Sequence, residues 1–93
     1  MKHIKLMADY ECYPLWDMDV VGNIDPANLS ISDSLKDGLI CWADDFTKTL
    51  DGKNSGFKDP TQRALFNERG KSLAKRLQLE LGGSYQVIYS PVS

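Results

Sequence analysis

The chain has 93 residues, with 11 Lys and Arg against 13 Asp and Glu, and a net charge of −2 at pH 7. Hydrophobic residues make up 42% and charged residues 26%, values that are typical of folded globular proteins and exclude a disordered chain. Because domains usually run to about 100–150 residues, residues 1–93 form one predicted domain, with little room for a deep active-site cavity.

The chain begins with a predicted strand over residues 3–9. Ile4, Leu6 and Ala8 alternate with Lys5 and Met7, and this period of two is typical of a half-buried strand. We therefore expect one apolar face on this strand and one polar face.

An irregular, aromatic-rich turn is expected over residues 10–16, because Pro14 removes a backbone donor and biases Tyr13 away from helix. Residues 17–30 then contain Gly22 and Asp25-Pro26 among few periodic apolar residues. This pattern predicts a loop of about fourteen residues that has room for a short helical turn. Loops of this length in small domains are often functional.

The clearest element is a helix predicted over residues 31–50. Ser30 or Ser32 is its expected N-cap, and Asp33 follows Ser30 at the capping-box spacing. Asp51-Gly52 is its expected end. Four carboxylates fall outside the apolar stripe: Asp33, Asp37, Asp44 and Asp45. The stripe has three- and four-residue steps typical of a helix and consists of Ile31, Leu35, Leu39, Trp42, Ala43, Phe46 and Leu50.

A second helix is predicted from Asp59-Pro60, where Asp59 is the N-cap and Pro60 the first helical residue, after a connector at residues 53–58. It extends to about Leu81 and ends at Gly82-Gly83. Residues 85–89 are β-rich and form a closing strand. The buried stripe expected on this helix consists of Phe66, Gly70, Leu73, Ala74, Leu77 and Leu81.

The order of elements is strand, long loop, helix, helix, strand, which predicts an α+β domain. Two helices with a short connector pack antiparallel, so we expect the last strand to pair antiparallel with the first. A two-stranded sheet is only marginally stable. A third strand within residues 15–25, or a strand from a second copy in a homodimer, would complete this short antiparallel sheet.

The residue inventory predicts no catalytic centre, metal site or cofactor. Cys12 and Cys41 are too far apart for a C-x-x-C pair, and His3 is the one histidine. Adjacent residues on a helix point about 100° apart, so Asp44 and Asp45 do not converge as an acid pair would. No apolar run reaches the length of a membrane span or resembles a secretion signal, which predicts a cytoplasmic protein with reduced thiols and no membrane partner.

A nucleic-acid-binding regulator is an alternative that the sequence leaves open. The second helix carries cations that would contact phosphates, with Tyr85 or Tyr89 available for stacking. The net acidity argues against this, and cations on an outer helix face commonly complement the helix dipole. The cations are Arg63, Arg69, Lys71, Lys75 and Arg76.

The charges are unevenly distributed, which suits a basic partner or, equally, two solvated faces that partly neutralise each other. Residues 1–50 carry four basic and nine acidic side chains, a charge of −5, whereas residues 51–93 carry +3. An acidic surface speeds association with a basic partner. The aromatic residues at positions 10–16 lie among carboxylates, a composition typical of an interface hot spot, although Leu15 and Trp16 could equally cap the core.

Several stretches together resemble small bacterial immunity proteins encoded beside polymorphic toxins of the contact-dependent growth-inhibition and rearrangement-hotspot systems. These are KLMADYECYPLW at residues 5–16, GNIDP at 22–26, WADD at 42–45, SGF at 55–57 and GKSLA at 70–74. The resemblance implies a cytosolic protein that binds a C-terminal toxin domain, often a nuclease such as an RNase, and occludes its active or substrate-binding site. It implies no catalytic residues.

On this hypothesis aromatic anchors and carboxylates form the toxin-binding site. The aromatic anchors are Tyr10, Tyr13 and Trp16. The carboxylates expected to meet basic residues of the toxin are Glu11, Asp17, Asp19, Asp25, Asp44 and Asp45.

Overall fold

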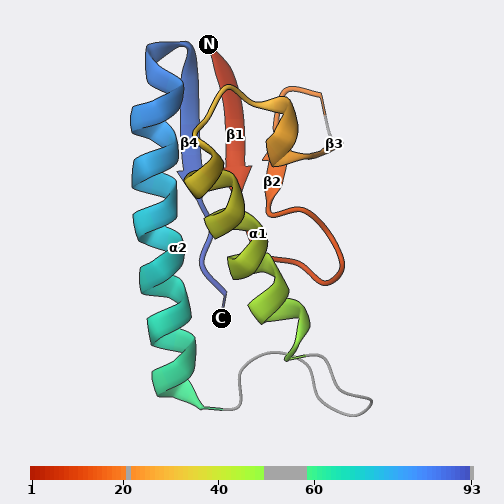
Figure 1. Cartoon of the computed structure of the whole chain (residues 1–93), viewed down its shortest axis with the longest axis vertical. Coiled ribbons are helices and arrows are strands. Elements are labelled where there is room, and N and C mark those ends of the chain that lie inside the picture. The colour runs from red at the N-terminus through yellow and green to blue at the C-terminus, as the bar shows by residue number, and fades with distance from the viewer. Residues whose placement is uncertain (21, 50–58, 93) are drawn as a thin grey trace.

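A computed structural model describes residues 1–20, 22–49 and 59–92 of the chain (Figure 1). Two short 3₁₀ turns, Pro26–Asn28 and Gly82–Ser84, connect the main elements. In chain order these are β1 (Lys2–Leu6), β2 (Leu15–Asp17), β3 (Gly22–Ile24), α1 (Asp33–Thr47), α2 (Pro60–Leu81) and β4 (Tyr85–Tyr89).

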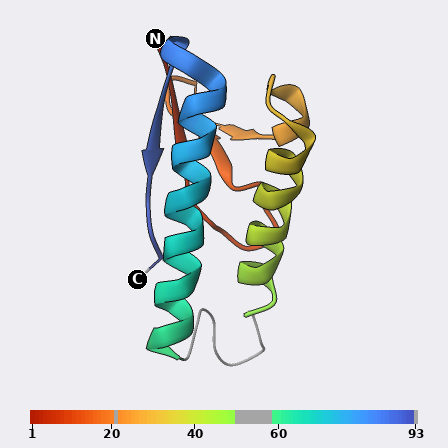
Figure 2. The same ribbon diagram turned by 60° about the vertical axis from the view of Figure 1, so that its left-hand side comes forward.

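The molecule has two layers, a four-stranded sheet in the order β3-β2-β1-β4 and a pair of helices. Figures 1 and 2 show α1 and α2 side by side, running in opposite directions over the same face of the sheet. The predicted alternation in the first strand explains this arrangement, because Ile4 and Leu6 are fully buried beneath the helices. The α+β prediction and the antiparallel helix pair are confirmed.

The predicted direction of the last strand is wrong. β4 pairs parallel with β1, from Lys2 opposite Tyr85 to Leu6 opposite Tyr89, so the sheet is mixed rather than antiparallel. The reason lies in β2, which runs antiparallel to β1 and returns the chain to its starting end. There the Met18 N–H donates to the His3 carbonyl oxygen. The two helices then lead the chain away from this end of the sheet and back to it. β4 therefore begins beside Lys2.

The segment predicted as a long loop contributes part of the sheet. β3 lies within it and pairs antiparallel with β2, with Leu15 opposite Ile24. The sheet therefore gains its third and fourth strands from residues 15–24 and needs none from a second copy. The expected short helical turn is present at Pro26–Asn28.

Both helices begin where the sequence predicts. Ser32 is the N-cap of α1, with its hydroxyl accepting from the Leu35 N–H at 3.3 Å, whereas Ser30 is not. Asp59 caps α2, and Gly82 follows α2 at a φ of 77°, a left-handed value that favours glycine. α1 ends at Thr47, earlier than predicted. The predictions made for Leu50, Asp51-Gly52 and the connector 53–58 lie outside the described residues.

The core centres on Trp42, which is fully buried between the two layers. Its ring stacks on Phe66 at a centroid distance of 4.5 Å, and its indole N–H donates to the Phe66 carbonyl oxygen at 2.9 Å. Gly70 makes room for this ring and for Tyr89. Leu73 and Leu81 of the predicted stripe are partly buried against this core.

Candidate functional site

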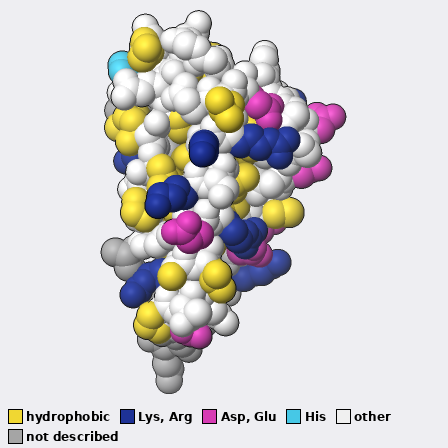
Figure 3. Space-filling model, turned by 90° about the vertical axis from the view of Figure 1, so that its left-hand side faces the viewer, with side chains coloured by type: hydrophobic (Ala, Val, Ile, Leu, Met, Phe, Trp, Pro, Cys, Tyr) yellow, Lys and Arg dark blue, Asp and Glu magenta, His cyan; other side chains and the backbone are white. Residues whose placement is uncertain are grey.

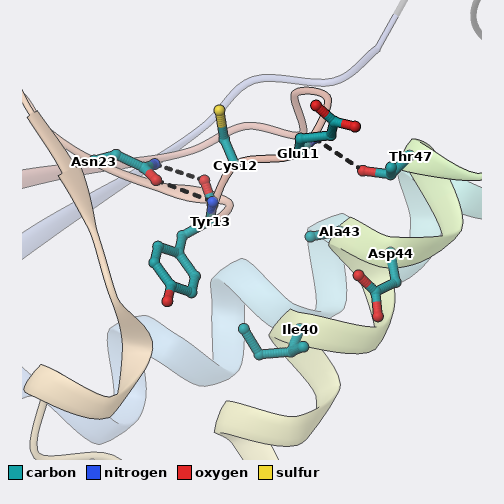
Figure 4. Close-up of a pocket in the computed structure, with 8 residues that line it drawn as sticks. All are labelled: Glu11, Cys12, Tyr13, Asn23, Ile40, Ala43, Asp44 and Thr47. Carbon is teal, nitrogen blue, oxygen red and sulfur yellow. Dashed lines mark hydrogen bonds between the residues drawn. The ribbon is translucent and has the colours of Figure 1, made fainter. Parts of the chain in front are cut away.

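A hollow of about 490 Å³ lies between the loop after β1 and the outer side of α1 (Figure 4). The loop supplies one wall, β3 contributes a single asparagine, and α1 supplies the other wall. The lining residues are Glu11, Cys12, Tyr13, Asn23, Ile40, Ala43, Asp44 and Thr47. Three segments that are distant in the sequence thus meet at one surface depression.

The loop wall is held in place by two side chains from outside it. The Thr47 hydroxyl accepts from the Glu11 N–H at 3.1 Å. The Asn23 amide accepts from the Tyr13 N–H at 3.0 Å and donates to the carbonyl oxygens of Tyr13 at 2.7 Å and Leu15 at 3.0 Å. These bonds fix the loop from both α1 and β3.

Glu11 has a φ of 56°, in the left-handed region that costs a non-glycine residue about 1–2 kcal/mol. Such conformations persist where the surroundings determine them, and they concentrate at functional sites. Here the bond to Thr47 satisfies the Glu11 N–H while the carboxylate extends to solvent. The strained backbone therefore presents a charge at the rim of the hollow.

The base of the loop is anchored in the core. The Tyr10 ring stacks on Phe46 at a centroid distance of 4.5 Å and an interplanar angle of 17°. Pro14 and Leu15 are buried at the other end of the loop. Tyr10 is thus a support for the loop, whereas Tyr13, with 42% of its surface exposed, is available for contact.

The hollow combines an apolar side and an anionic side. In Figure 4 the Tyr13 ring and Ile40 lie on one side, and the carboxylates of Glu11 and Asp44 lie on the other. Asp37 precedes Asp44 by about two helical turns, so it extends the acidic rim along the same face of α1. Such a surface suits a basic side chain with an apolar stem.

Within residues 1–20, 22–49 and 59–92, no cation pairs with the carboxylates of this rim. Among the described residues, no ion pair or side-chain hydrogen bond is formed by the carboxylate of Glu11, Asp37 or Asp44. Asp45, next in sequence, instead accepts from Arg69 at 2.7 Å. Among the described residues, therefore, Asp45 has a cationic partner and its neighbour Asp44 has none.

Asp17 and Asp19 lie at the turn between β2 and β3, away from the hollow, and have structural contacts there. Asp17 accepts from the N–H groups of Val20 and Asp19 and pairs with Lys2 at 3.2 Å. The N–H of Val20, followed by that of Asp19, holds the pKa of Asp17 below its usual value. Asp19 accepts from the His3 N–H at 2.8 Å and the His3 ring at 3.1 Å, and these bonds lower its pKa too.

Three further predicted site residues are also placed elsewhere. The Trp16 indole N–H donates to the Met7 carbonyl oxygen at 3.0 Å. Asp25 caps the Pro26–Asn28 turn by accepting from the Ala27 N–H. Asp45 faces α2 and pairs with Arg69. Of the nine residues predicted to bind the partner, the structure gathers Glu11, Tyr13 and Asp44 at the hollow, with Tyr10 beneath them.

Sequence reasoning missed the residues that shape the hollow between these groups. In the sequence, Asn23 follows Gly22 and resembles an ordinary turn residue. Thr47 lies near the end of the first predicted helix and shows no sign of a role in the site. The spacing of Ile40 and Asp44, four residues apart on the polar side of the stripe, was a usable signal because such residues are neighbours on a helix. The contacts of Asn23 and Thr47 with the loop had no local signature.

Three of the five cations of α2 lie near carboxylates of the same molecule. Arg69 pairs with Asp45, Arg76 with Glu80 at 3.0 Å, and Lys71 lies 4.0 Å from Glu68. Figure 3 shows the resulting mixture of cationic, anionic and hydrophobic side chains on this side of the molecule. The second helix therefore presents no continuous cationic stripe.

In the described parts of the chain, no group of three or more His, Cys, Asp and Glu residues has the arrangement of a metal site. Neither α1 nor α2 carries an apolar stretch suited to crossing a membrane.

Comparison with protein families gives a match that covers almost the whole chain. A family model described as Serratia CdiI immunity protein-like matches residues 2–92. No curated protein matches the chain.

Proposed function

The chain belongs to the Serratia CdiI immunity protein-like family, and we propose that it neutralises its cognate toxin by binding the toxin domain over the hollow between the 10–13 loop and α1. Membership supports the toxin-neutralising role itself. The contact surface, the class of toxin and the mode of inhibition are the proposal.

The observation that carries the proposal is a set of carboxylates, without an ion-pair partner among the described residues, around a half-apolar hollow. Glu11 and Asp44 flank it and Tyr13 supplies an exposed aromatic ring. Aromatic anchors beside charges that become desolvated on binding are typical of interface hot spots. The loop is already fixed by Thr47 and Asn23, so little ordering entropy is lost on binding.

The complementary surface is a basic one, which leads to the class of toxin. A nuclease binds its substrate through Lys and Arg side chains that contact phosphates. An acidic, aromatic surface that covers those cations occludes the substrate-binding site. We therefore propose that the toxin is a nuclease, that this chain acts as an inhibitor without catalysis of its own, and that it does so in the cytoplasm.

The other residues considered for the contact have a different place in the proposal. Trp16, Asp17, Asp19 and Asp25 have intramolecular partners, as does Asp45. Detaching these groups on binding would cost their existing bonds. The contact therefore centres on Glu11, Tyr13 and Asp44.

The first experiment captures the tagged chain from its native cells through a high-salt wash and identifies what stays bound by mass spectrometry. The proposal predicts one large toxin protein or its C-terminal domain. Recovery of nucleic acid, or of this chain alone, contradicts it.

The second experiment measures the affinity of the captured toxin domain for Glu11→Gln/Asp44→Asn by calorimetry. Removing two charges at the centre of the contact is expected to weaken binding at least about 30-fold, equivalent to roughly 2 kcal/mol. The matched control is Asp59→Asn/Glu68→Gln, which removes the same charge from α2 and keeps a good N-cap. Equal weakening of both pairs would show a net-charge effect and contradict the site.

A further inference from the structure

A second hollow, of about 610 Å³, lies between the two helices. It is lined by Gly38 of α1 and, from α2, by Leu65, Glu68, Arg69, Ser72 and Leu73. Gly38 lets Leu73 approach closely, since a Cβ at Gly38 would lie 3.3 Å from Leu73 Cδ2. A glycine and a leucine thus form an apolar floor that a partner's side chain can reach.

Two exposed leucines lie on α2, one lining this hollow and the other further along the helix. Leu65 is 61% exposed and Leu79 is 76% exposed. They are two heptads apart, so they lie on nearly the same side of α2 and roughly 21 Å from each other along its axis. Ser72 lies midway and is small enough to let another helix approach. The same face therefore offers both projections and a recess.

We infer that this face, defined by Leu65, Ser72 and Leu79 with the adjoining hollow, is the interface of a homodimer. A two-fold interface uses the same patch on both copies and must complement itself. An antiparallel copy centred on Ser72 places Leu65 against the partner's Leu79. It also places Glu68, one turn before the centre, near the partner's Lys75, about one turn after it.

The charges at this face favour a second copy over other partners. Glu68 and Lys71 are both 72% exposed and of opposite sign. The same register brings Arg69 near the partner's Arg76, but each arginine is already paired with a carboxylate of its own chain, Arg69 with Asp45 and Arg76 with Glu80. Figure 3 shows both signs interspersed with hydrophobic side chains over this side. A phosphate backbone or a strongly basic protein would favour one sign.

Two other surfaces, the outer edge of β4 and the acidic hollow, are less suited to self-association. The outer edge of β4 is occupied by the Gln78 amide, which donates to the Tyr85 carbonyl oxygen and accepts from the Val87 N–H. The acidic hollow is the second such surface, and two copies of it would repel each other.

Gly38 and Asp44 lie about 120° apart around α1, so the helix face and the toxin contact are separate and both can be occupied together.

Sedimentation velocity over a range of chain concentrations tests this inference. The wild type should approach twice the 10.4 kDa of one chain as concentration rises, and Leu65→Glu should stay at one chain. Val20→Glu is the control, because Val20 is 75% exposed in the turn between β2 and β3. Circular dichroism confirms that each variant is folded.

A charge exchange gives a second readout that a folding defect cannot imitate. Glu68→Lys should weaken the dimer, and adding Lys75→Glu should restore it by exchanging the paired signs. A wild type that remains one chain at every concentration overturns the inference, as does a dimer that Leu65→Glu leaves intact. Because toxin binding is measured separately on Glu11 and Asp44, failure of the dimer leaves the proposed function untouched.

Discussion

At the scale of single residues, Gly70 decides how closely α2 packs on the core. A Cβ at this position would lie 2.6 Å from Trp42 Cζ2 and 2.6 Å from the Tyr89 hydroxyl. Trp42 is fully buried and has no space into which to move. The overlap outweighs the gain of about 1 kcal/mol that alanine brings to a helix.

Gly70→Ala is therefore expected to lower the free energy of unfolding by about 1–2 kcal/mol, because extra atoms in a packed core are destabilising. Urea titrations measure this change. Gly83→Ala is the control, because a Cβ there meets nothing within 4 Å. If the Gly70→Ala chain is as stable as the wild type, Trp42 and Tyr89 can move to make room for the added methyl group, which contradicts the prediction.

Glu80 joins the end of α2 to the start of α1. Its carboxylate accepts from the Ser32 N–H at 2.6 Å, the Ser32 hydroxyl at 2.9 Å and Arg76 at 3.0 Å. The N–H of an N-cap residue usually bonds a side chain within its own helix. Here the partner is 48 residues away, which is why the local pattern of Ser30 and Asp33 led to the wrong capping box.

The Glu80 contacts predict a dependence of stability on pH. The Ser32 N–H, followed by the Ser32 hydroxyl and Arg76, lowers the pKa of Glu80 in the folded state. Its stabilisation is therefore complete above the ordinary carboxyl range near pH 4 and is lost as the pH falls through the lowered pKa. Melting temperatures between about pH 7 and pH 3 should fall less steeply for Glu80→Gln than for the wild type. Parallel curves would contradict this assignment.

At the scale of elements, side-chain amides of α2 take the place of a strand beside β4. The Gln78 amide bonds the Tyr85 carbonyl oxygen and the Val87 N–H, both at 2.8 Å. Further along, the Asn67 amide bonds the N–H and carbonyl oxygen of Val92 at 3.0 and 2.9 Å. Open edges are templates for unwanted pairing, and these amides occupy this one.

Gln78→Ala is expected to leave the Val87 N–H without its acceptor and to lower stability by about 1–3 kcal/mol. Amide hydrogen exchange should then accelerate at Val87. Gln86→Ala, at an exposed position of the same strand, is the control. Unchanged exchange at Val87 would mean that the Gln78 bond does not protect this edge.

The elements themselves were largely predictable, whereas the sheet was not. The stripe around Trp42 and the Asp59-Pro60 start of α2 are local patterns, and both appear in the structure. β2 and β3 are three residues each, and an alternating pattern cannot be recognised in so short a segment. Because β2 returns the chain to its starting end, missing it also reversed the predicted direction of β4.

At the scale of the whole molecule, the candidate site depends on which acidic residues find partners. The acidic residues before residue 50 include Asp17, Asp19 and Asp45, which have basic partners, and Glu11 and Asp44, which have none among the described residues. Asp44 and Asp45 are adjacent and alike in sequence, but Arg69 of α2 neutralises only Asp45. That distinction follows from the rotation of α1 against α2, and the placement of Asn23 and Thr47 around the loop likewise follows from the tertiary fold.

We propose that this chain protects a cell by covering its toxin with the surface around Glu11 and Asp44. This is tested by the viable count of cells that express the captured toxin domain together with this chain at matched level. Cells should survive with the wild type and with Asp59→Asn/Glu68→Gln, and should die with Glu11→Gln/Asp44→Asn, each variant being folded by circular dichroism. Full survival with Glu11→Gln/Asp44→Asn would contradict the site, and death with the wild type would contradict the neutralisation itself.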